Sequence, residues 1–362
     1  MAENNPVSLY GKKSVNEMNK DKGKRLFITA LRDRAEIYGL IGKYEKAIEE
    51  YEKILRICKK SDPSIRAELI LRISALLVTG RSDLKGARRL ICKLQKFSGT
   101  KNSPSFQARI LNMLGIICRR ELNYVQAEKY FQKALNIYKK LKDNYAMNAV
   151  LSNIALLAFN RDEYDNALHY YNKCLFLDKK INDKLGMATT FNNIGLVYQE
   201  IGDYEKAIEY YNKSLMAAEK TGYRMGAGTA LGNCGAVFEK QGDYSKAIEY
   251  YKKNFQIAKE LGFRRQLGIS SGLLGKVFIN NGEYTQALKF SKIAFTIFQE
   301  LNDINRMTLA QIHLGITYTK LRQYAKAGVH LYRAEQNAMK MNDKKLLSLV
   351  KSAIFDLEKN KK

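Results

Sequence analysis

The stretch I-G-D-Y-E-K-A-I-E-Y-Y-N-K-S-L, residues 201–215, recurs along the chain every 40 residues. Tyrosine holds the place of Tyr204 in seven of eight recurrences, and Leu84 holds it in the other. The tyrosines are Tyr44, Tyr124, Tyr164, Tyr204, Tyr244, Tyr284 and Tyr324. An alanine follows three residues after each of these positions, from Ala47 to Ala327. A fixed period of this size predicts an all-α solenoid, in which each unit packs only on its neighbours.

Each period predicts two antiparallel helices, which we call helix A and helix B of repeats one to eight. In repeat five, we expect helix A from about Lys184 to Ile201. Gly202 can adopt the left-handed conformation that ends a helix, and Asp203 is a favourable N-cap for helix B. Gly195 and Ala207 are small, which predicts that helices A and B approach closely at these two residues.

The pattern divides the chain into three parts. Residues 1–22 are polar and lack helical periodicity, so we expect a flexible tail. Residues 23–342 contain the eight repeats. Residues 343–362 predict a capping helix and basic tail, because Leu346, Val350 and Leu357 are spaced to cover the open end of an array.

The order of residues within a repeat resembles the tetratricopeptide repeat. A small residue is followed by an aromatic three residues on, then Gly-Asp-Tyr and an alanine three residues after the tyrosine. The usual period of that family is 34 residues. The longer period is similar to the Partner-of-Inscuteable-type and kinesin-light-chain-type arrays. The resemblance implies a right-handed α-solenoid (superhelix) of about eight helix pairs plus a C-terminal capping helix.

The same resemblance implies that the A helices line a concave groove that binds a peptide or helix of a partner. Carried over position by position, it predicts a set of groove residues from repeats three to seven. They are Arg109, Asn112, Ile116, Arg119, Arg120, Asn153, Leu156, Asn160, Asn192, Asn193, Leu196, Gln199, Asn233, Lys276 and Asn280. Three of them, Asn153, Asn193 and Asn233, recur at the period and have a structural alternative, hydrogen bonding to the chain itself.

The net charge of +26 favours acidic partners, such as an acidic peptide, an anionic lipid or a nucleic acid. Residues 81–120 are the most basic part of the chain, and Asp83 is their only acid. We expect the basic side chains of helix B in repeat two to point outward. They are Lys85, Arg88, Arg89, Lys93 and Lys96. Nucleic-acid binding through this segment is one alternative, and an ordinary solvated surface is another.

No arrangement of residues predicts catalysis, a cofactor or a metal site. The histidines His169, His313 and His330 lie in different repeats, and we expect a groove-facing or structural role for His313. The five cysteines form no CxxC pair, which favours small core residues in a reducing compartment. We expect a cytoplasmic protein, because no apolar run is long enough to span a membrane and the N-terminal residues lack the apolar segment of a signal peptide.

The sequence therefore predicts a non-catalytic scaffold or adaptor whose partner is a protein or peptide. A peptide-responsive regulatory or sensor array, controlling an enzyme or transcription factor, is the second hypothesis. The identity of the partner and the oligomeric state are not predicted.

Overall fold

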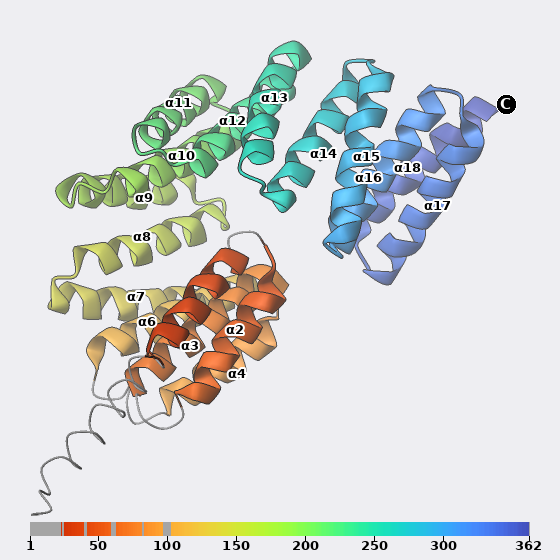
Figure 1. Ribbon diagram of the computed structural model, residues 1–362. Coiled ribbons are helices and arrows are strands. Elements are labelled where there is room, and N and C mark those ends of the chain that lie inside the picture. The colour runs from red at the N-terminus through yellow and green to blue at the C-terminus, as the bar shows by residue number, and fades with distance from the viewer. Residues whose placement is uncertain are drawn as a thin grey trace, which may run out of the picture. The chain divides into compact units, whose positions relative to one another are not determined.

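The computed structural model describes residues 23, 25–39, 42–58, 63–81, 83–96 and 103–361, which form helices joined by short turns (Figure 1). These described ranges contain no β-strand. Contacts between Cα atoms divide the chain into two compact units. Unit 1 comprises residues 1–143 and unit 2 comprises residues 144–362. The tail predicted for residues 1–22 lies outside the described residues.

Unit 1 contains repeats one to three. Helical residues 25–39 precede α2 (Tyr44–Ile57), α3 (Pro63–Leu76), the π-helical segment η2 (Leu77–Arg81), α4 (Leu84–Gln95), α6 (Pro104–Arg120) and α7 (Tyr124–Leu141). The sequence does not predict η2. A Cβ atom on Gly80 would lie 2.2 Å from the ring of Tyr44, so the absent side chain leaves room for that ring.

Unit 2 contains repeats four to eight and the last helix. Its A helices are α8 (Asn144–Phe159), α10 (Lys184–Ile201), α12 (Arg224–Lys240), α14 (Arg264–Asn280) and α16 (Ile304–Lys320). Its B helices are α9 (Tyr164–Lys180), α11 (Tyr204–Lys220), α13 (Tyr244–Glu260), α15 (Tyr284–Glu300) and α17 (Tyr324–Lys340). Each A helix packs against the B helix that follows it, and each repeat packs on the next (Figure 1). The all-α solenoid of helix pairs is thus confirmed.

The predicted helix ends in repeat five are confirmed. Helix α10 runs from Lys184 to Ile201, and Gly202 then adopts φ 91°, the left-handed conformation. The carboxylate of Asp203 accepts a hydrogen bond of 3.0 Å from the backbone N–H of Lys206, which caps α11. These local signals set the turn between the two helices.

The close approach of α10 and α11 is also confirmed. A Cβ atom on Gly195 would lie 2.6 Å from the ring of Tyr211 and 3.2 Å from the carbonyl oxygen of Ala207. Both Ala207 and Tyr211 are fully buried. In repeat six, Gly235 meets the ring of Tyr251 in the same way, at 2.7 Å. A glycine in helix A therefore makes room for the large aromatic residue of helix B.

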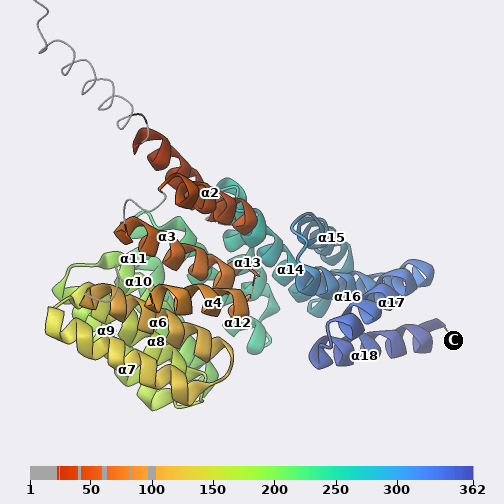
Figure 2. The same cartoon turned by 90° about the horizontal axis from the view of Figure 1, so that it is seen from below.

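Helix α18 (Lys344–Lys361) covers the end of unit 2, as predicted. It packs against α16 and α17 (Figure 2). Leu346, Val350 and Leu357 are buried in this contact and join the core of repeat eight.

Four of the five cysteines lie in the core, and one does not. Cys58, Cys118, Cys174 and Cys234 are buried, whereas Cys92 on α4 is exposed. None of them forms a disulfide within the described residues.

Candidate functional site

Successive A helices lie next to each other, so their side chains form a surface of their own. Contacts join α10 to α12 and α14 to α16 in unit 2. We call the surface formed by α8, α10, α12, α14 and α16 the A-helix face. Most of the predicted groove residues lie on these helices, and those of repeat three lie on α6 in unit 1.

Several predicted groove residues bind each other or a neighbouring helix. The side-chain nitrogen of Asn233 on α12 donates a 2.8 Å hydrogen bond to the side-chain oxygen of Asn192 on α10. Lys276 and Asn280 of α14 both reach the Glu239 carboxylate on α12, at 2.9 and 3.3 Å. These contacts hold adjacent A helices together. They support a structural role for Asn192, Asn233, Lys276 and Asn280, which the sequence predicts as residues that bind a partner.

Gln199 lies in the contact between helices rather than on the open surface. It is only 9% exposed, and its side-chain oxygen accepts a 3.1 Å hydrogen bond from the hydroxyl of Tyr211. The counterpart in repeat six is Glu239, which accepts a 2.9 Å bond from the hydroxyl of Tyr251. The tyrosine of helix B thus finds its acceptor on helix A of the same repeat.

The remaining groove residues of unit 2 are partly buried. They are Asn153, Leu156, Asn160, Asn193 and Leu196. Leu196 packs against the core of repeats five and six. Of the recurrent asparagines, Asn233 bonds to Asn192 within the chain, which agrees with the structural alternative for this residue.

In unit 1, Arg109 belongs to an ionic network across three A helices. Its guanidinium lies 2.5 Å from the carboxylate of Glu68 on α3. Glu68 also binds Arg72 at 3.0 Å, and Arg72 binds Glu36 at 2.6 Å. Burial acts to raise the pKa of Glu68, but the hydrogen bonds and charges of Arg109 and Arg72 together outweigh it, so the pKa is lowered. Arg109 is therefore engaged within the chain.

The other predicted residues of α6 differ in exposure. Arg120 is exposed, and Asn112, Ile116 and Arg119 are partly buried. Ile116 packs against the core of unit 1.

Two hollows open on the A-helix face of unit 2. The first, of about 240 Å³, lies between α8 and α10. It is lined by Tyr145, Asn148, Ala149, Ser152, Asp183, Leu185, Gly186, Thr189 and Thr190. The second, of about 130 Å³, involves α14, α15 and α16 and is largely apolar, with Lys276, Arg306 and His313 among its lining residues. The hydroxyls of Thr189 and Thr190 donate within the chain, so their oxygens are left to accept. With the hydroxyls of Tyr145 and Ser152, which can donate or accept, they give the first hollow partners for an extended backbone.

A buried carboxyl group, Asp178 of α9, supports the wall of the first hollow. It is completely buried and accepts hydrogen bonds from the amide of Asn148 and, at 3.0 Å, from the hydroxyl of Thr190. Burial raises the pKa of Asp178 to about 6, and the nearby Asp183 acts in the same direction. Sequence reasoning missed this residue. A comparison of the repeats could have found it, because repeats five, six and eight have alanine at the position equivalent to Asp178.

We expect Asp178→Asn to make the protein more stable at about pH 7.5, by on the order of 1–2 kcal/mol, because the ionised carboxylate is costly to bury. The folded-state pKa is raised, so the wild-type carboxyl contributes stability below about pH 3.8 that is lost as pH rises through 6. The advantage of the variant should therefore shrink as the pH falls. Urea unfolding at about pH 7.5 and about pH 4.5 measures this difference.

The control for this prediction is Asp165→Asn, because Asp165 is an exposed acid on the same helix. It should show no such pH-dependent difference. A gain from Asp178→Asn of equal size at both pH values would contradict the proposed protonation of Asp178.

His313 lies beside the second hollow as a neutral imidazole. It is 7% exposed, and burial, together with the charge of Lys276, lowers its pKa to about 4. His330 stacks on the ring of Tyr318 at 5.6 Å between ring centres, and His169 is exposed. Across the part of the chain that the structure describes, no group of three or more potential metal ligands converges.

The basic side chains of α4 point outward, with one exception. Lys85, Arg89, Lys93 and Lys96 are exposed, as predicted. Arg88 is partly buried and forms an ion pair with Glu121, the residue that follows α6. Arg88 thus differs from the other four residues predicted to point outward, because a carboxylate from the next repeat reaches it.

No described helix combines the length and the hydropathy needed to cross a membrane. Curated protein sequences include no match to this chain.

Known structures of similar fold are distant in sequence. A signal-transduction ATPase with a tetratricopeptide repeat sensor, from Pyrococcus horikoshii, has a TM-score of 0.63 at 18% identity, over 89% of this chain and 50% of that one. A Rap protein complexed with competence and sporulation factor has a TM-score of 0.58 at 14% identity, over 92% of this chain and 98% of that one. Aspartyl phosphate phosphatase F from Bacillus subtilis has a TM-score of 0.58 at 13% identity, over 92% and 94%. At these identities the likeness shows the fold alone.

Family models for the tetratricopeptide repeat match residues 33–61 and, in overlapping segments, 106–180, 146–220 and 186–260. The matched segments include the Gly-Asp-Tyr turns and the close contacts of helices A and B described above. This chain belongs to the tetratricopeptide repeat proteins.

Proposed function

We propose that this protein is a non-catalytic interaction module that binds an extended peptide segment of a partner on the A-helix face of unit 2. Membership of the tetratricopeptide repeat proteins supports a role in protein interaction. The observation that supports the location is the hollow of about 240 Å³ between α8 and α10. An extended peptide there can use its backbone N–H and C=O groups, because the lining offers several hydroxyl groups.

A peptide-responsive regulatory array is the second candidate. The solved structures of similar fold include a protein described as having a tetratricopeptide repeat sensor and a Rap protein complexed with competence and sporulation factor. Both candidates require the same event, binding of a peptide. They differ in whether the bound peptide changes the activity of another protein.

In the test, peptides from a random display library are selected for binding to the intact protein. Their affinities for three variants are then compared with their affinity for the wild type. Ala149→Trp places a large side chain in the hollow, because Ala149 is an exposed lining residue. Ala325→Trp makes the same change at an exposed residue of α17, a B helix that lines neither hollow, and is the matched control. We expect Ala149→Trp to weaken the selected peptides at least about tenfold, or about 1.4 kcal/mol, and Ala325→Trp to leave them unchanged.

The third variant reverses the outer charges, with Lys85, Arg89 and Lys93 changed to glutamate. These exposed side chains should contribute at most about 1 kcal/mol if the A-helix face is the site. Loss of binding in this variant alone, with a steep dependence on salt, would contradict the proposal. It would instead indicate an acidic partner or a nucleic acid on α4.

A further inference from the structure

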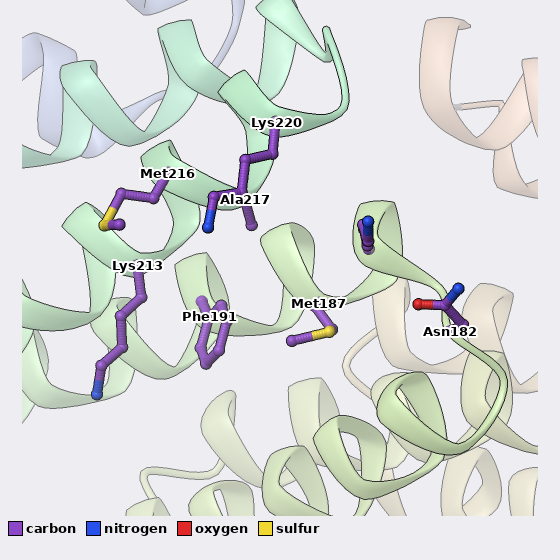
Figure 3. A pocket seen from close by; sticks show the side chains of 8 residues that line it. Asn182, Met187, Phe191, Lys213, Met216, Ala217 and Lys220 are labelled. Atoms are coloured by element: carbon purple, nitrogen blue, oxygen red, sulfur yellow. The ribbon is translucent and has the colours of Figure 1, made fainter.

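A second kind of cavity lies within repeat five, between α10 and α11 (Figure 3). Its volume is about 320 Å³. The floor is apolar, with Met187 and Phe191 of α10 opposite Met216 and Ala217 of α11 (Figure 3). Three lysines complete the lining, namely Lys184, Lys213 and Lys220, together with Asn182.

The cavity exists because repeat five lacks a side chain that its neighbours have. The residue equivalent to Ala217 is Leu177 in repeat four, Ile257 in repeat six and Ile297 in repeat seven. Ile57 and Ile137 are the equivalents in repeats one and three, so five repeats have a branched aliphatic residue at this position. Alanine leaves that space open.

The charges around the cavity also differ from those at the equivalent positions of repeats six and seven. In repeats six and seven, the first residue of helix A forms an ion pair with the last residue of helix B. These pairs are Arg224–Glu260 and Arg264–Glu300. Repeat five has lysines at both positions, Lys184 and Lys220. Neither lysine forms an ion pair with any residue that the structure describes. Two positive charges therefore remain uncompensated at the place where repeats six and seven pair a cation with an acid.

The third lysine is held in place. Lys213 forms an ion pair of 2.6 Å with Glu209 and lies 4.4 Å from the centre of the Tyr210 ring. Tyr210 in turn contacts Phe191, with 6.2 Å between ring centres. These contacts fix the aromatic wall of the cavity and leave Lys184 and Lys220 as the cations available to a ligand.

We propose that this cavity binds an acidic peptide, with an apolar side chain of the peptide inside it and flanking carboxylates paired with Lys184 and Lys220. An apolar cavity of roughly 150 Å³ is large enough to bind benzene, so the volume here admits an aromatic side chain. Methionine side chains adapt to such a ring and attract it through sulfur. Carboxylates are the complementary partners of two lysines that lack an acid.

This site is separate from the one on the A-helix face. It uses Lys184, Met187 and Phe191 of α10, whereas the first hollow uses residues 185, 186, 189 and 190, which point to another side of the helix. The inference therefore does not depend on the proposed function, and either can fail without the other.

The experiment follows the methyl groups of the methionines by NMR in the full-length protein labelled with ¹³C-methyl methionine. The probe is the blocked pentapeptide Glu-Glu-Phe-Glu-Glu. We expect saturable shifts centred on Met187 and Met216, because the phenylalanine ring would lie against both side chains. Binding by one such anchor should have a dissociation constant of roughly 0.1–1 mM.

Three variants test the two features that define the site. Ala217→Ile restores the side chain found in repeats six and seven, and Lys220→Glu restores their acid. Each should weaken the probe at least about tenfold, a change of about 1.4 kcal/mol. Lys340→Glu is the control and makes the same charge change at the equivalent exposed position of repeat eight. In that repeat the first residue of helix A is Ile304 and not a lysine. This variant should leave binding unchanged. Lys220→Glu keeps the test decisive if Ala217→Ile folds poorly.

Several results would overturn the proposal. One is the absence of shifts at Met187 and Met216 up to several times the expected dissociation constant. A second is an equal shift with Glu-Glu-Gly-Glu-Glu, which would show that the phenylalanine is not needed. A third is an equal shift with Lys-Lys-Phe-Lys-Lys, which would show that the carboxylates are not needed. A stronger response to a single-stranded oligonucleotide would assign the lysines to phosphate instead.

Discussion

Replacing Ala207 with leucine should lower the free energy of unfolding by about 1–3 kcal/mol, because the added atoms have no space between α10 and α11. Ala207 is fully buried, and its carbonyl oxygen already lies 3.2 Å from the place where a Cβ atom on Gly195 would stand. Because each repeat is stabilised by its neighbours, the loss should spread to repeats four and six. Urea unfolding gives the size of the effect, and amide hydrogen exchange over residues 187–251 gives its extent.

The same helix supplies the control. Ala217→Leu makes an identical change ten residues further along α11, where the side chain borders the open cavity of repeat five. We expect this variant to be tolerated, with a change below about 1 kcal/mol in either direction. Equal losses from the two substitutions would mean that the cost comes from leucine in this helix and not from the contact with α10.

Replacing Glu239 with leucine should destabilise unit 2 by about 1–3 kcal/mol, because several donors would lose their acceptor at once. The carboxylate of Glu239 is 10% exposed and binds Tyr251, Lys276 and Asn280, which lie on α13 and α14. The greatest loss is at Tyr251, which is fully buried and whose hydroxyl would be left without a partner. Urea unfolding would measure it, and hydrogen exchange should show α12, α13 and α14 opening more often.

Glu239→Gln is the control variant for Glu239→Leu. Repeat five has a glutamine, Gln199, at the equivalent position. There, Gln199 accepts the hydrogen bond from the hydroxyl of Tyr211. A glutamine at position 239 can keep its oxygen as the acceptor for Tyr251. Its NH2 group then faces the two donors of α14, so the ion pair with the exposed Lys276 and the hydrogen bond from Asn280 are lost. The exposed ion pair should contribute less than about 1 kcal/mol. If glutamine and leucine cost the same, the contacts of Glu239 with α14, and not its hydrogen bond to Tyr251, hold these helices together.

Features that depend on a few neighbouring residues were predictable from the sequence. The end of α10 at Ile201, the left-handed Gly202 and the cap by Asp203 all follow from local conformational preferences and local hydrogen bonds. The contact of Gly195 with the large residue of helix B was predictable for a different reason. The period of 40 residues places the same kind of residue at each packing position in eight repeats. This recurrence of small and large residues reveals which positions are in contact.

Other turns were decided by tertiary structure. The turns of repeats three and eight have Leu122 and Arg322 where repeat five has Gly202, and both adopt positive φ values, 62° and 57°. A side chain disfavours this conformation. The packing of helix A against helix B imposes the turn nonetheless, because both helices must keep the register of the repeat.

The sequence by itself thus determined the repeat, the helix pairs and the family, because these follow from periodicity and from short-range preferences. Only the tertiary structure decided which polar residues on the A helices bind their own neighbours. Gln199 and Glu239 occupy the same position of the repeat, yet Glu239 also binds two residues about 40 positions away on α14, while Gln199 is buried against Tyr211. Such contacts depend on distances between helices of successive repeats, and those distances are set by the packing of large and small side chains on both sides.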